Sequence, residues 1–152
     1  MKILLATDGA KQSDAAIDTM KHLRFTGGDE IKVVNVIDMA LPTSIDIYGG
    51  YLPDTTELEK TARDHGSKIL EQTRAKLNEI TGGASAVSVT TEMLFGSPES
   101  RIVETAESWK ADLIIVGSHG YSRWERLLLG SVSDSVVHHA PCSVLVVRIP
   151  PE

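Results

Sequence analysis

Two glycine-rich segments in the carboxyl-terminal third of the chain carry the residue types that bind phosphate. Val116-Gly117-Ser118-His119-Gly120 is followed, after nine residues, by Gly130-Ser131-Val132-Ser133. The apolar, β-branched run from Asp112 to Val116 is typical of a strand that is covered on both faces in a parallel sheet. Glycine permits positive φ and carries no Cβ to block a ligand, so we expect both properties at the three glycines of this pattern.

The second glycine segment leads into a predicted helix, Val132 to Ala140. The free backbone N–H groups of that helix, its dipole and the hydroxyls of Ser131 and Ser133 can converge on a phosphate. Such an anion cradle would contain no lysine. A tight strand-to-helix turn explains the first glycine pair on steric grounds alone, but it explains the second small-residue site at 130–131 less well.

The spacing of these glycines differs from that of the better-known nucleotide loops. No G-x-x-x-x-G-K-[ST] occurs in the chain, and the first predicted strand is followed by Thr7-Asp8-Gly9-Ala10 in place of G-x-G-x-x-G. A P-loop enzyme and a dinucleotide-binding Rossmann domain are therefore both disfavoured.

The elements that must position these segments alternate regularly along the chain. Such alternation predicts a three-layer α/β domain, with a parallel sheet, helices on both faces and right-handed crossovers. We expect the flavodoxin-like strand order 3-2-1-4-5. The long second helix has a mostly apolar stripe of Leu58, Ala62, Ile69, Thr73, Leu77 and Ile80. Strands are predicted at 2–6, 30–38, 87–94, 112–116 and 143–149, and helices from about Ser13, from Thr56, from Pro98 with Ser97 as N-cap, and from 132 to 140.

Strands 1 and 4 are neighbours in this order, at the crest where ligands bind to open α/β sheets. Asp8 and Gly117 can therefore face one pocket although they lie far apart in the sequence. An aspartate at the end of a strand can also simply cap the turn that follows it. The position of Asp8 at the crest favours a role in binding.

Composition limits the class of protein. The 152 residues are enough for one domain, and we expect residues 1–152 to form a single one. The net charge of −6, without a Lys/Arg run, argues against a nucleic-acid surface. Cys142 is the single cysteine, no signal sequence precedes the first strand, and no apolar run approaches the ~20 residues of a membrane span. We therefore expect a cytoplasmic protein without a membrane partner.

The pattern G-x-x-G, nine residues, then G-S resembles the ATP-binding motif of the universal stress protein family. The likeness extends nearly from end to end, through Ile3 to Gly9, Val33 to Asp38, Gly96-Ser97-Pro98 and Pro141 to Val147. One departure is Ala6, which stands where many members carry proline before Thr-Asp. This change alters the rigidity of the loop and leaves the acidic residue in place.

The resemblance implies a set of nucleotide-binding residues. Asp8 matches an aspartate that contacts the nucleotide near the ribose and the metal, here Mg²⁺, and Val36 matches a residue beside adenine. Ala6 and Thr7 line the base pocket by the same correspondence. His119 either faces phosphate, as its family counterpart does, or is simply an exposed turn residue. The expected binding residues are Ala6, Thr7, Asp8, Val36, Val116, Gly117, His119, Gly120, Gly130, Ser131, Val132 and Ser133.

The function that follows is binding of ATP by a stress-response or regulatory protein, with slow ATP hydrolysis or another ATP-consuming reaction as the alternative. No general base is paired with a nucleophile in the sequence, so no catalytic residue is assigned. A response-regulator receiver would need an aspartate where Met93-Leu94-Phe95 stands. A flavodoxin would need a hydroxyl-rich loop after the first strand. An interaction module that has lost nucleotide binding is opposed by the intact glycine pattern.

Two further segments bear on partners. The apolar last strand, Ser143 to Ile149, lies at a sheet edge in the proposed order, and only Arg148 in it is charged. This edge predicts a homodimer through antiparallel pairing of the strand with its copy, unless a loop covers it. Met39 to Pro53 is a long loop with two interpretations that both stay open, a disordered excursion or a flap near the nucleotide or a partner.

Overall fold

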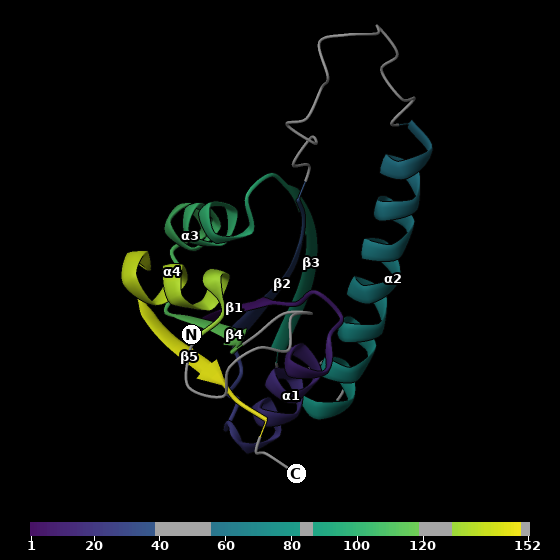
Figure 1. Ribbon diagram of the computed structural model, residues 1–152. Helices are drawn as coiled ribbons and strands as arrows, with labels where there is room; N and C mark the ends of the chain where they lie inside the picture. Colours follow the sequence, from purple (N-terminus) through teal and green to yellow (C-terminus); the bar gives the residue numbers. More distant parts are fainter. Residues whose placement is uncertain (39–55, 83–86, 119–128, 150–152) are drawn as a thin grey trace, which may run out of the picture.

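Five parallel strands and four α-helices make up the described part of the computed structural model, residues 1–38, 56–82, 87–118 and 129–149. The strands form one sheet in the order β3-β2-β1-β4-β5, which confirms the predicted fold class (Figure 1). The elements are β1 (Lys2–Ala6), α1 (Lys11–Thr19) with a 3-10 turn (Met20–His22), β2 (Asp29–Ile37), α2 (Thr56–Ile80), β3 (Val87–Phe95), α3 (Pro98–Trp109), β4 (Leu113–Gly117), α4 (Ser131–His139) and β5 (Ser143–Val147).

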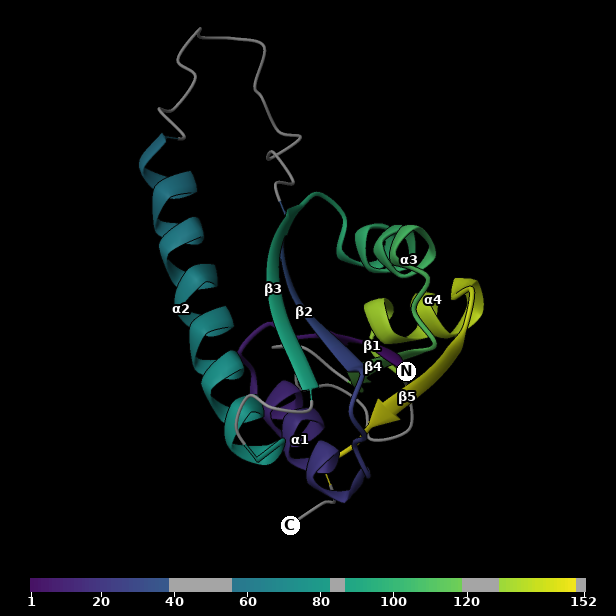
Figure 2. The same cartoon turned by 180° about the vertical axis from the view of Figure 1, so that it is seen from behind.

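Helices cover both faces of this sheet (Figures 1 and 2), and an apolar layer lies on each face. Side chains alternate between the faces along each strand, so Ile3 and Leu5 join the layer under α1 and α2, whereas Leu4 and Ala6 join the layer under α3 and α4. We call these the α1/α2 face and the α3/α4 face. Because both faces are covered, the central strands read as continuous apolar runs.

The register places β1 between β2 and β4. Ala6 pairs with Val34 on one side, and Leu5 pairs with Ile115 on the other. Since all the strands are parallel, their carboxyl ends meet at a single edge of the sheet. The connections leave β1 and β4 in opposite directions, which produces the predicted switch point at this edge.

The expected apolar stripe of α2 is only partly buried. Ile69 and Leu77 are buried against the sheet, but Leu58 is 69% exposed. Figures 1 and 2 show the amino-terminal turns of α2 running beyond the ends of β2 and β3. Periodicity predicts which side of a helix is apolar and not how far the sheet beneath it extends, so Leu58 belongs to the apolar stripe and is nevertheless exposed.

Most element boundaries differ from the prediction by one or two residues. The helix α1 begins at Lys11, two residues before Ser13, and β5 ends at Val147, two residues before Ile149. Ser97 is the N-cap residue of α3 and Pro98 its first residue, as predicted. None of the helices in the described ranges is long and apolar enough to cross a membrane.

Polar contacts close the amino-terminal edge of the sheet. The amino group of Met1 donates to Oδ1 of Asp29 at 2.7 Å, and the backbone N–H of Thr26 donates to Oδ2 at 2.7 Å. These two hydrogen bonds lower the pKa of Asp29 below its ordinary value of 3.8. Nearby, the N–H of Lys2 donates to Oδ2 of Asp112 at 2.6 Å.

A tryptophan extends this closed edge. The ring of Trp109, the last residue of α3, has the ammonium groups of Lys2 and Lys32 at 5.4 Å and 5.2 Å from its centroid. Lys32 also forms an ion pair with Glu92 of β3 at 3.0 Å. Through Trp109, the two lysines tie β1 and β2 to the end of α3.

Candidate functional site

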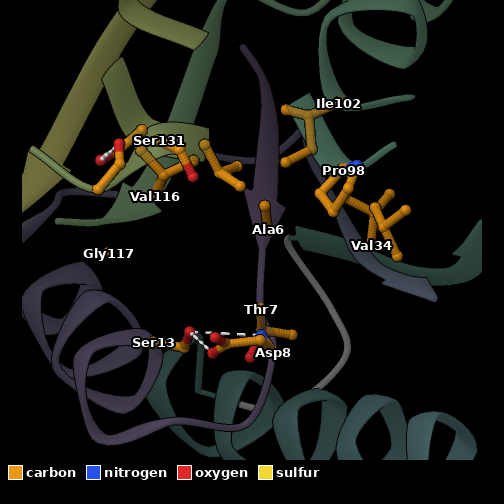
Figure 3. A pocket seen from close by; sticks show the side chains of 14 residues that line it. Ala6, Thr7, Asp8, Ser13, Val34, Pro98, Ile102, Val116, Gly117 and Ser131 are labelled. Carbon is orange, nitrogen blue, oxygen red and sulfur yellow. Dashed lines mark hydrogen bonds between the residues drawn. The ribbon is translucent and has the colours of Figure 1, made fainter. Parts of the chain in front are cut away.

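A cavity of about 250 Å³ opens at the opposite edge of the sheet, where β1 and β4 end (Figure 3). Ten of the twelve residues expected at the site line this cavity, although they come from four separate parts of the chain. His119 and Gly120 lie outside the described residues. The lining consists of Ala6, Thr7, Asp8, Ser13, Val34, Val36, Pro98, Ile102, Val116, Gly117, Gly130, Ser131, Val132 and Ser133.

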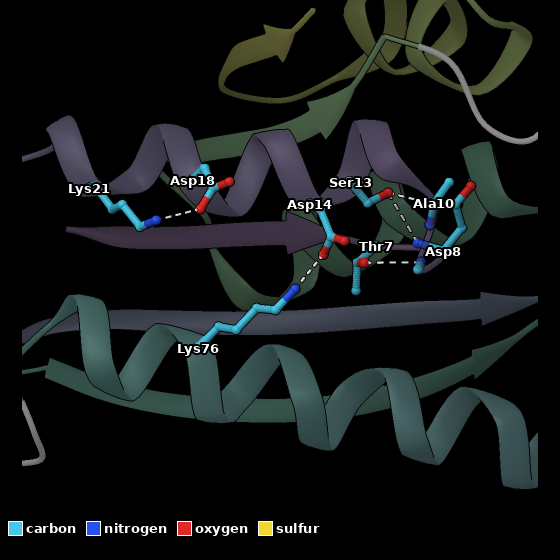
Figure 4. A network of polar contacts seen from close by, with 9 residues as sticks. Thr7, Asp8, Ala10, Ser13, Asp14, Asp18, Lys21 and Lys76 are labelled. Carbon is cyan, nitrogen blue, oxygen red and sulfur yellow. Dashed lines mark hydrogen bonds and ion pairs between the residues drawn. The ribbon is translucent and has the colours of Figure 1, made fainter. Parts of the chain in front are cut away.

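The turn after β1 is held by the side chain of Asp8 (Figures 3 and 4). Its Oδ1 atom accepts hydrogen bonds from the N–H of Ala10 at 2.9 Å and from the hydroxyl of Ser13 at 2.5 Å. The N–H of Asp8 in turn donates to Ser13 Oγ at 3.3 Å. Asp8 therefore does cap its turn. Its Oδ2 atom accepts no hydrogen bond from the described residues.

The two described glycines of the phosphate pattern do not use positive φ, contrary to expectation. Gly130 has φ −64° and ψ 156°, an extended conformation that any residue adopts. Gly117 is also absent from the positive-φ residues of the described chain. A Cβ on Gly117 would lie 3.0 Å from the backbone carbon of Gln12, the second residue of α1. Gly117 is thus required by close packing of α1 on β4, and the steric explanation holds for it.

The carbonyl of Ser118 joins the two glycine segments. It accepts hydrogen bonds from the N–H of Gly130 at 2.7 Å and from the hydroxyl of Ser133 at 2.9 Å. The N–H of Ser118 donates to the carbonyl of Val147 at 2.8 Å, which anchors the junction to β5. The first turn of α4 is therefore fixed against the end of β4.

This junction changes the role expected of Ser133. The side chain is 3% exposed, and its hydroxyl lies 2.9 Å from the Ser118 carbonyl and 3.0 Å from that of Gly130. A hydroxyl has a single hydrogen to donate, and here a backbone carbonyl takes it. The expected donation from this hydroxyl to a phosphate is not available in this structure, and Ser133 instead orders the helix start.

Backbone donors remain at the amino terminus of α4. Gly130 is the N-cap residue and makes no side-chain capping bond, and the first intrahelical bond runs from the N–H of Asp134 to the Gly130 carbonyl at 2.9 Å. The N–H groups of Ser131, Val132 and Ser133 consequently have no acceptor within the helix. They lie at the cavity together with the positive end of the helix dipole, which suits an anion.

The opposite wall of the cavity is apolar, and sequence reasoning missed most of it. Val34 and Val36 occupy the same face of β2, and Ile102 and Pro98 come from α3. The alternation of side chains along β2 was a signal that could have added Val34 once Val36 was chosen. The sequence indicates Ile102 and Pro98 only as helix core and helix start, and Ser13 only as the start of the first helix.

The electrostatics of the lining are simple. Asp8 is the one ionisable side chain in it, and no lysine, arginine or histidine lines the described cavity. Within the described residues, no group of three or more His, Cys, Asp and Glu side chains could hold a metal by itself. A divalent cation at Asp8 would therefore take its other ligands from water and from the oxygens of a bound anion, as Mg²⁺ commonly does.

Comparison with known proteins places these features in a family. Residues 1–148 match the model of the universal stress protein family. A relative from Staphylococcus aureus (strain USA300) that carries the universal stress protein name is 35% identical over 147 residues, which cover 96% of this chain and 82% of the relative.

Solved structures share the fold over nearly the whole chain. The protein MJ0577, whose biochemical function was assigned from its structure, superposes with a TM-score of 0.81 at 26% identity, covering 99% of this chain and 97% of that one. An Arabidopsis thaliana universal stress protein family protein with AMP bound gives 0.66 at 20% identity, with 99% and 92% covered. A universal stress protein in complex with cAMP gives 0.61 at 23%, with 97% and 95% covered.

Proposed function

The chain belongs to the universal stress protein family, and from this premise we propose that it binds an adenine nucleotide, ATP with Mg²⁺, and acts as a cytoplasmic stress-response regulator. The observation that carries the proposal is the cavity where the ends of β1 and β4 meet the amino terminus of α4. It combines an apolar slot, one carboxylate and a set of free backbone donors.

The apolar part of the cavity suits a purine base. Val34, Val36 and Ile102 provide a wall with no charged group, against which an aromatic ring can pack. The complexes of two family proteins with AMP and cAMP support adenine as the base. In the proposed pose Ala6 and Thr7 lie beside the base, as the family correspondence implies.

The polar part of the cavity suits the phosphates. The free N–H groups of Ser131, Val132 and Ser133 would donate to phosphate oxygens at the positive end of α4. The described residues that line the cavity include no cationic side chain, so they do not themselves neutralise the charge of a triphosphate. Mg²⁺ held between Asp8 Oδ2, water and phosphate oxygens would supply the missing positive charge.

Calorimetric titration tests the proposal. We expect ATP to bind in the presence of Mg²⁺ and to bind at least about tenfold more weakly when EDTA removes the metal, because about 1.4 kcal/mol of charge neutralisation is then lost. AMP should depend far less on Mg²⁺. Absence of binding by ATP, ADP, AMP and cAMP alike would reject the proposed function.

Gly130→Val is the matched site variant. The backbone of Gly130 is extended, so valine can adopt it without backbone strain, and we expect its side chain to occupy the approach to the α4 donors. ATP binding should be lost while the circular dichroism and the melting temperature stay close to wild type. Gly27→Val is the control, because a Cβ added to Gly27 would have no neighbouring atom within 4 Å and this glycine lies at the other end of β2. Equal ATP affinity in the two variants would contradict the proposed pose.

We propose a signalling role with at most slow hydrolysis, since Asp8 has no second acid or base beside it among the described lining residues. ATP-consuming catalysis is the alternative. A steady-state turnover of about 1 s⁻¹ or more, which is an ordinary enzymatic rate, would favour that alternative over the signalling role.

We further propose a homodimer through β5. This strand is at the end of the sheet, and Val144, Leu145 and Val146 are only half-buried in the single chain. A two-fold axis beside β5 would pair the strand with its copy antiparallel and continue the sheet across both subunits. Sedimentation at micromolar concentration should show a dimer, and Val146→Pro, which removes a backbone donor, should dissociate it. A monomeric wild type would contradict this arrangement.

A further inference from the structure

We propose that Asn35, on the α1/α2 face of the sheet, positions the β1–α1 segment of the nucleotide site on the other face, and that Gly66 of α2 provides the space this asparagine needs. The segment meant is residues 7–10. Neither residue lines the cavity, so both act by positioning other residues. The effect on ATP affinity rests on the proposed nucleotide binding, whereas the effect on the backbone does not.

Asn35 is a polar residue in an otherwise apolar layer. It is 6% exposed, and its neighbours on the same face of β2, Ile31 and Val33, belong to the core under α1 and α2. Its Nδ2 atom donates a hydrogen bond to the carbonyl of Thr7 at 2.8 Å. Burying an amide group without a hydrogen bond is energetically unfavourable. The hydrogen bond of Asn35 satisfies this group and connects β2 to the residue immediately after β1.

This hydrogen bond lies where the β1–β2 ladder stops. The last paired residues are Ala6 and Val34, and the N–H of Thr7 still donates to the Val34 carbonyl at 3.0 Å. Thr7 and Asn35 would form the next pair, but they do not. In a continuing parallel ladder the N–H of Val36 would donate to the Thr7 carbonyl. Here the side-chain amide of Asn35 binds that carbonyl, so β1 separates from β2 at Thr7.

The separation has a consequence for the cavity. Because the Val34 carbonyl points toward β1, the alternation of a parallel ladder directs the N–H and C=O of Val36, two residues later, to the same side. Val36 lines the cavity, and β1 has already left its place beside it. Asn35 thus keeps the backbone of Val36 open toward the cavity and at the same time holds Thr7 at its wall.

Gly66 explains how the amide fits beneath α2. A Cβ on Gly66 would lie 2.7 Å from Oδ1 of Asn35 and 3.1 Å from Cε of Met93. Gly66 is buried within a helix of 25 residues, where glycine is otherwise unfavourable relative to alanine. Its presence is accounted for by the close approach of α2 to the Asn35 side chain.

The first experiment separates positioning from mere core packing. Asn35→Leu keeps the branched shape of the side chain and removes the donor, and leucine suits the apolar layer, so the variant should fold. Amide hydrogen exchange in the nucleotide-free protein should become faster at residues 8–10, while Val36 should become slower because its N–H can now pair with the Thr7 carbonyl. Exchange at Val34, which is inside the ladder in both proteins, is the internal control.

The second experiment uses the contact with Gly66. Gly66→Ala should push the amide of Asn35 out of place and weaken ATP binding about tenfold, the fold-change that corresponds to one hydrogen bond of positioning. Asn35→Ala should have a similar effect. In the double variant the clash with Asn35 is absent, and the remaining contact is with the flexible end of Met93, so Gly66→Ala should add no further loss of affinity to Asn35→Ala.

The outcomes are distinguishable. Faster exchange at residues 8–10 in Asn35→Leu, with non-additive losses of ATP affinity in the Gly66 and Asn35 variants, supports the proposal. Unchanged exchange at residues 8–10 and at Val36 in a folded Asn35→Leu protein overturns it, as does additivity of the two alanine substitutions. If wild type binds no adenine nucleotide, the proposed function fails, and the exchange experiment still decides whether Asn35 positions the segment.

Discussion

The amino-terminal and carboxyl-terminal edges of the sheet are built from the same strands but differ in whether their polar groups are paired within the described part of the protein. At the amino-terminal edge, charged groups have partners within the chain: the Met1 amino group pairs with Asp29, and the Lys2 ammonium lies over the Trp109 ring. At the carboxyl-terminal edge, the cavity is lined by small, hydroxyl-bearing and apolar residues with one carboxylate. One edge is closed by its own partners, and the other keeps backbone donors and a carboxylate oxygen without partners among the described residues.

This difference shows how the chain separates stability from binding. Polar groups at the carboxyl-terminal edge are restrained mainly through the backbone, as in the Ser118 junction, or through a side chain from the far face, as at Asn35. Such restraints hold the backbone around the cavity in place without filling the cavity itself. Substitutions at this edge should therefore affect ligand binding, and substitutions at the amino-terminal edge should affect stability alone.

We expect the largest effect from Gly117→Val, which should lower both the stability of the protein and its affinity for ATP although it lies at the carboxyl-terminal edge. The new side chain would meet backbone atoms of Gln12, at 3.0 Å and 3.1 Å from its Cβ, and backbone cannot move aside as a side chain can. We expect a loss of about 2–3 kcal/mol in the free energy of unfolding, as for overpacked cores, together with weakened ATP binding. Urea denaturation and calorimetry measure the two effects. A change within about 0.5 kcal/mol would show that α1 does not need this close approach.

Ser133→Ala is a smaller test, confined to the carboxyl-terminal edge. It removes the hydroxyl that donates to the Ser118 carbonyl, which still accepts from the N–H of Gly130. We expect a loss of about 1 kcal/mol in the free energy of unfolding, the value of one hydrogen bond, and weaker ATP binding through a less ordered helix start. Ser135→Ala, on the same helix but only partly buried, is the matched control. Equal effects of the two variants on affinity would remove the positioning role of Ser133.

We expect the smallest effect from a substitution of Asp29 at the amino-terminal edge, and this effect should be on stability alone. The pKa of Asp29 is lowered in the folded protein by hydrogen bonds from the Met1 amino group and the Thr26 N–H. Its contribution to stability is therefore present above the unfolded pKa, near 4, and is lost as the pH falls through the lower folded value. Asp29→Asn should lower stability at neutral pH and should flatten the loss of stability below about pH 4.

Urea midpoints measured from neutral pH down to about pH 2 would check this dependence. ATP affinity at neutral pH should be the same in Asp29→Asn and wild type, because Asp29 lies at the edge away from the cavity. A substantial loss of affinity in this variant would show that the two edges are coupled, and the separation of stability from binding would then be wrong.

The sequence by itself determined the architecture and the location of the candidate site. Continuous apolar runs alternating with amphipathic helices specify a parallel sheet covered on both faces, and the order 3-2-1-4-5 was predicted and confirmed. That order brings the segments after β1 and β4 together, so ten of the twelve expected residues line the same cavity. These predictions were possible because the patterns that indicate burial and strand structure are carried by residues close together in the sequence.

The tertiary structure alone decided which partner each polar group has. Ser133 donates to a carbonyl 15 positions away, and Asn35 to one 28 positions away, and neither pairing leaves a periodic signal. Gly117 fits the phosphate pattern, yet close packing against Gln12 accounts for it. Leu58 continues an apolar stripe beyond the reach of the sheet. Residue types specify which surfaces are buried, whereas the contacts of single atoms depend on how distant segments are brought together in space.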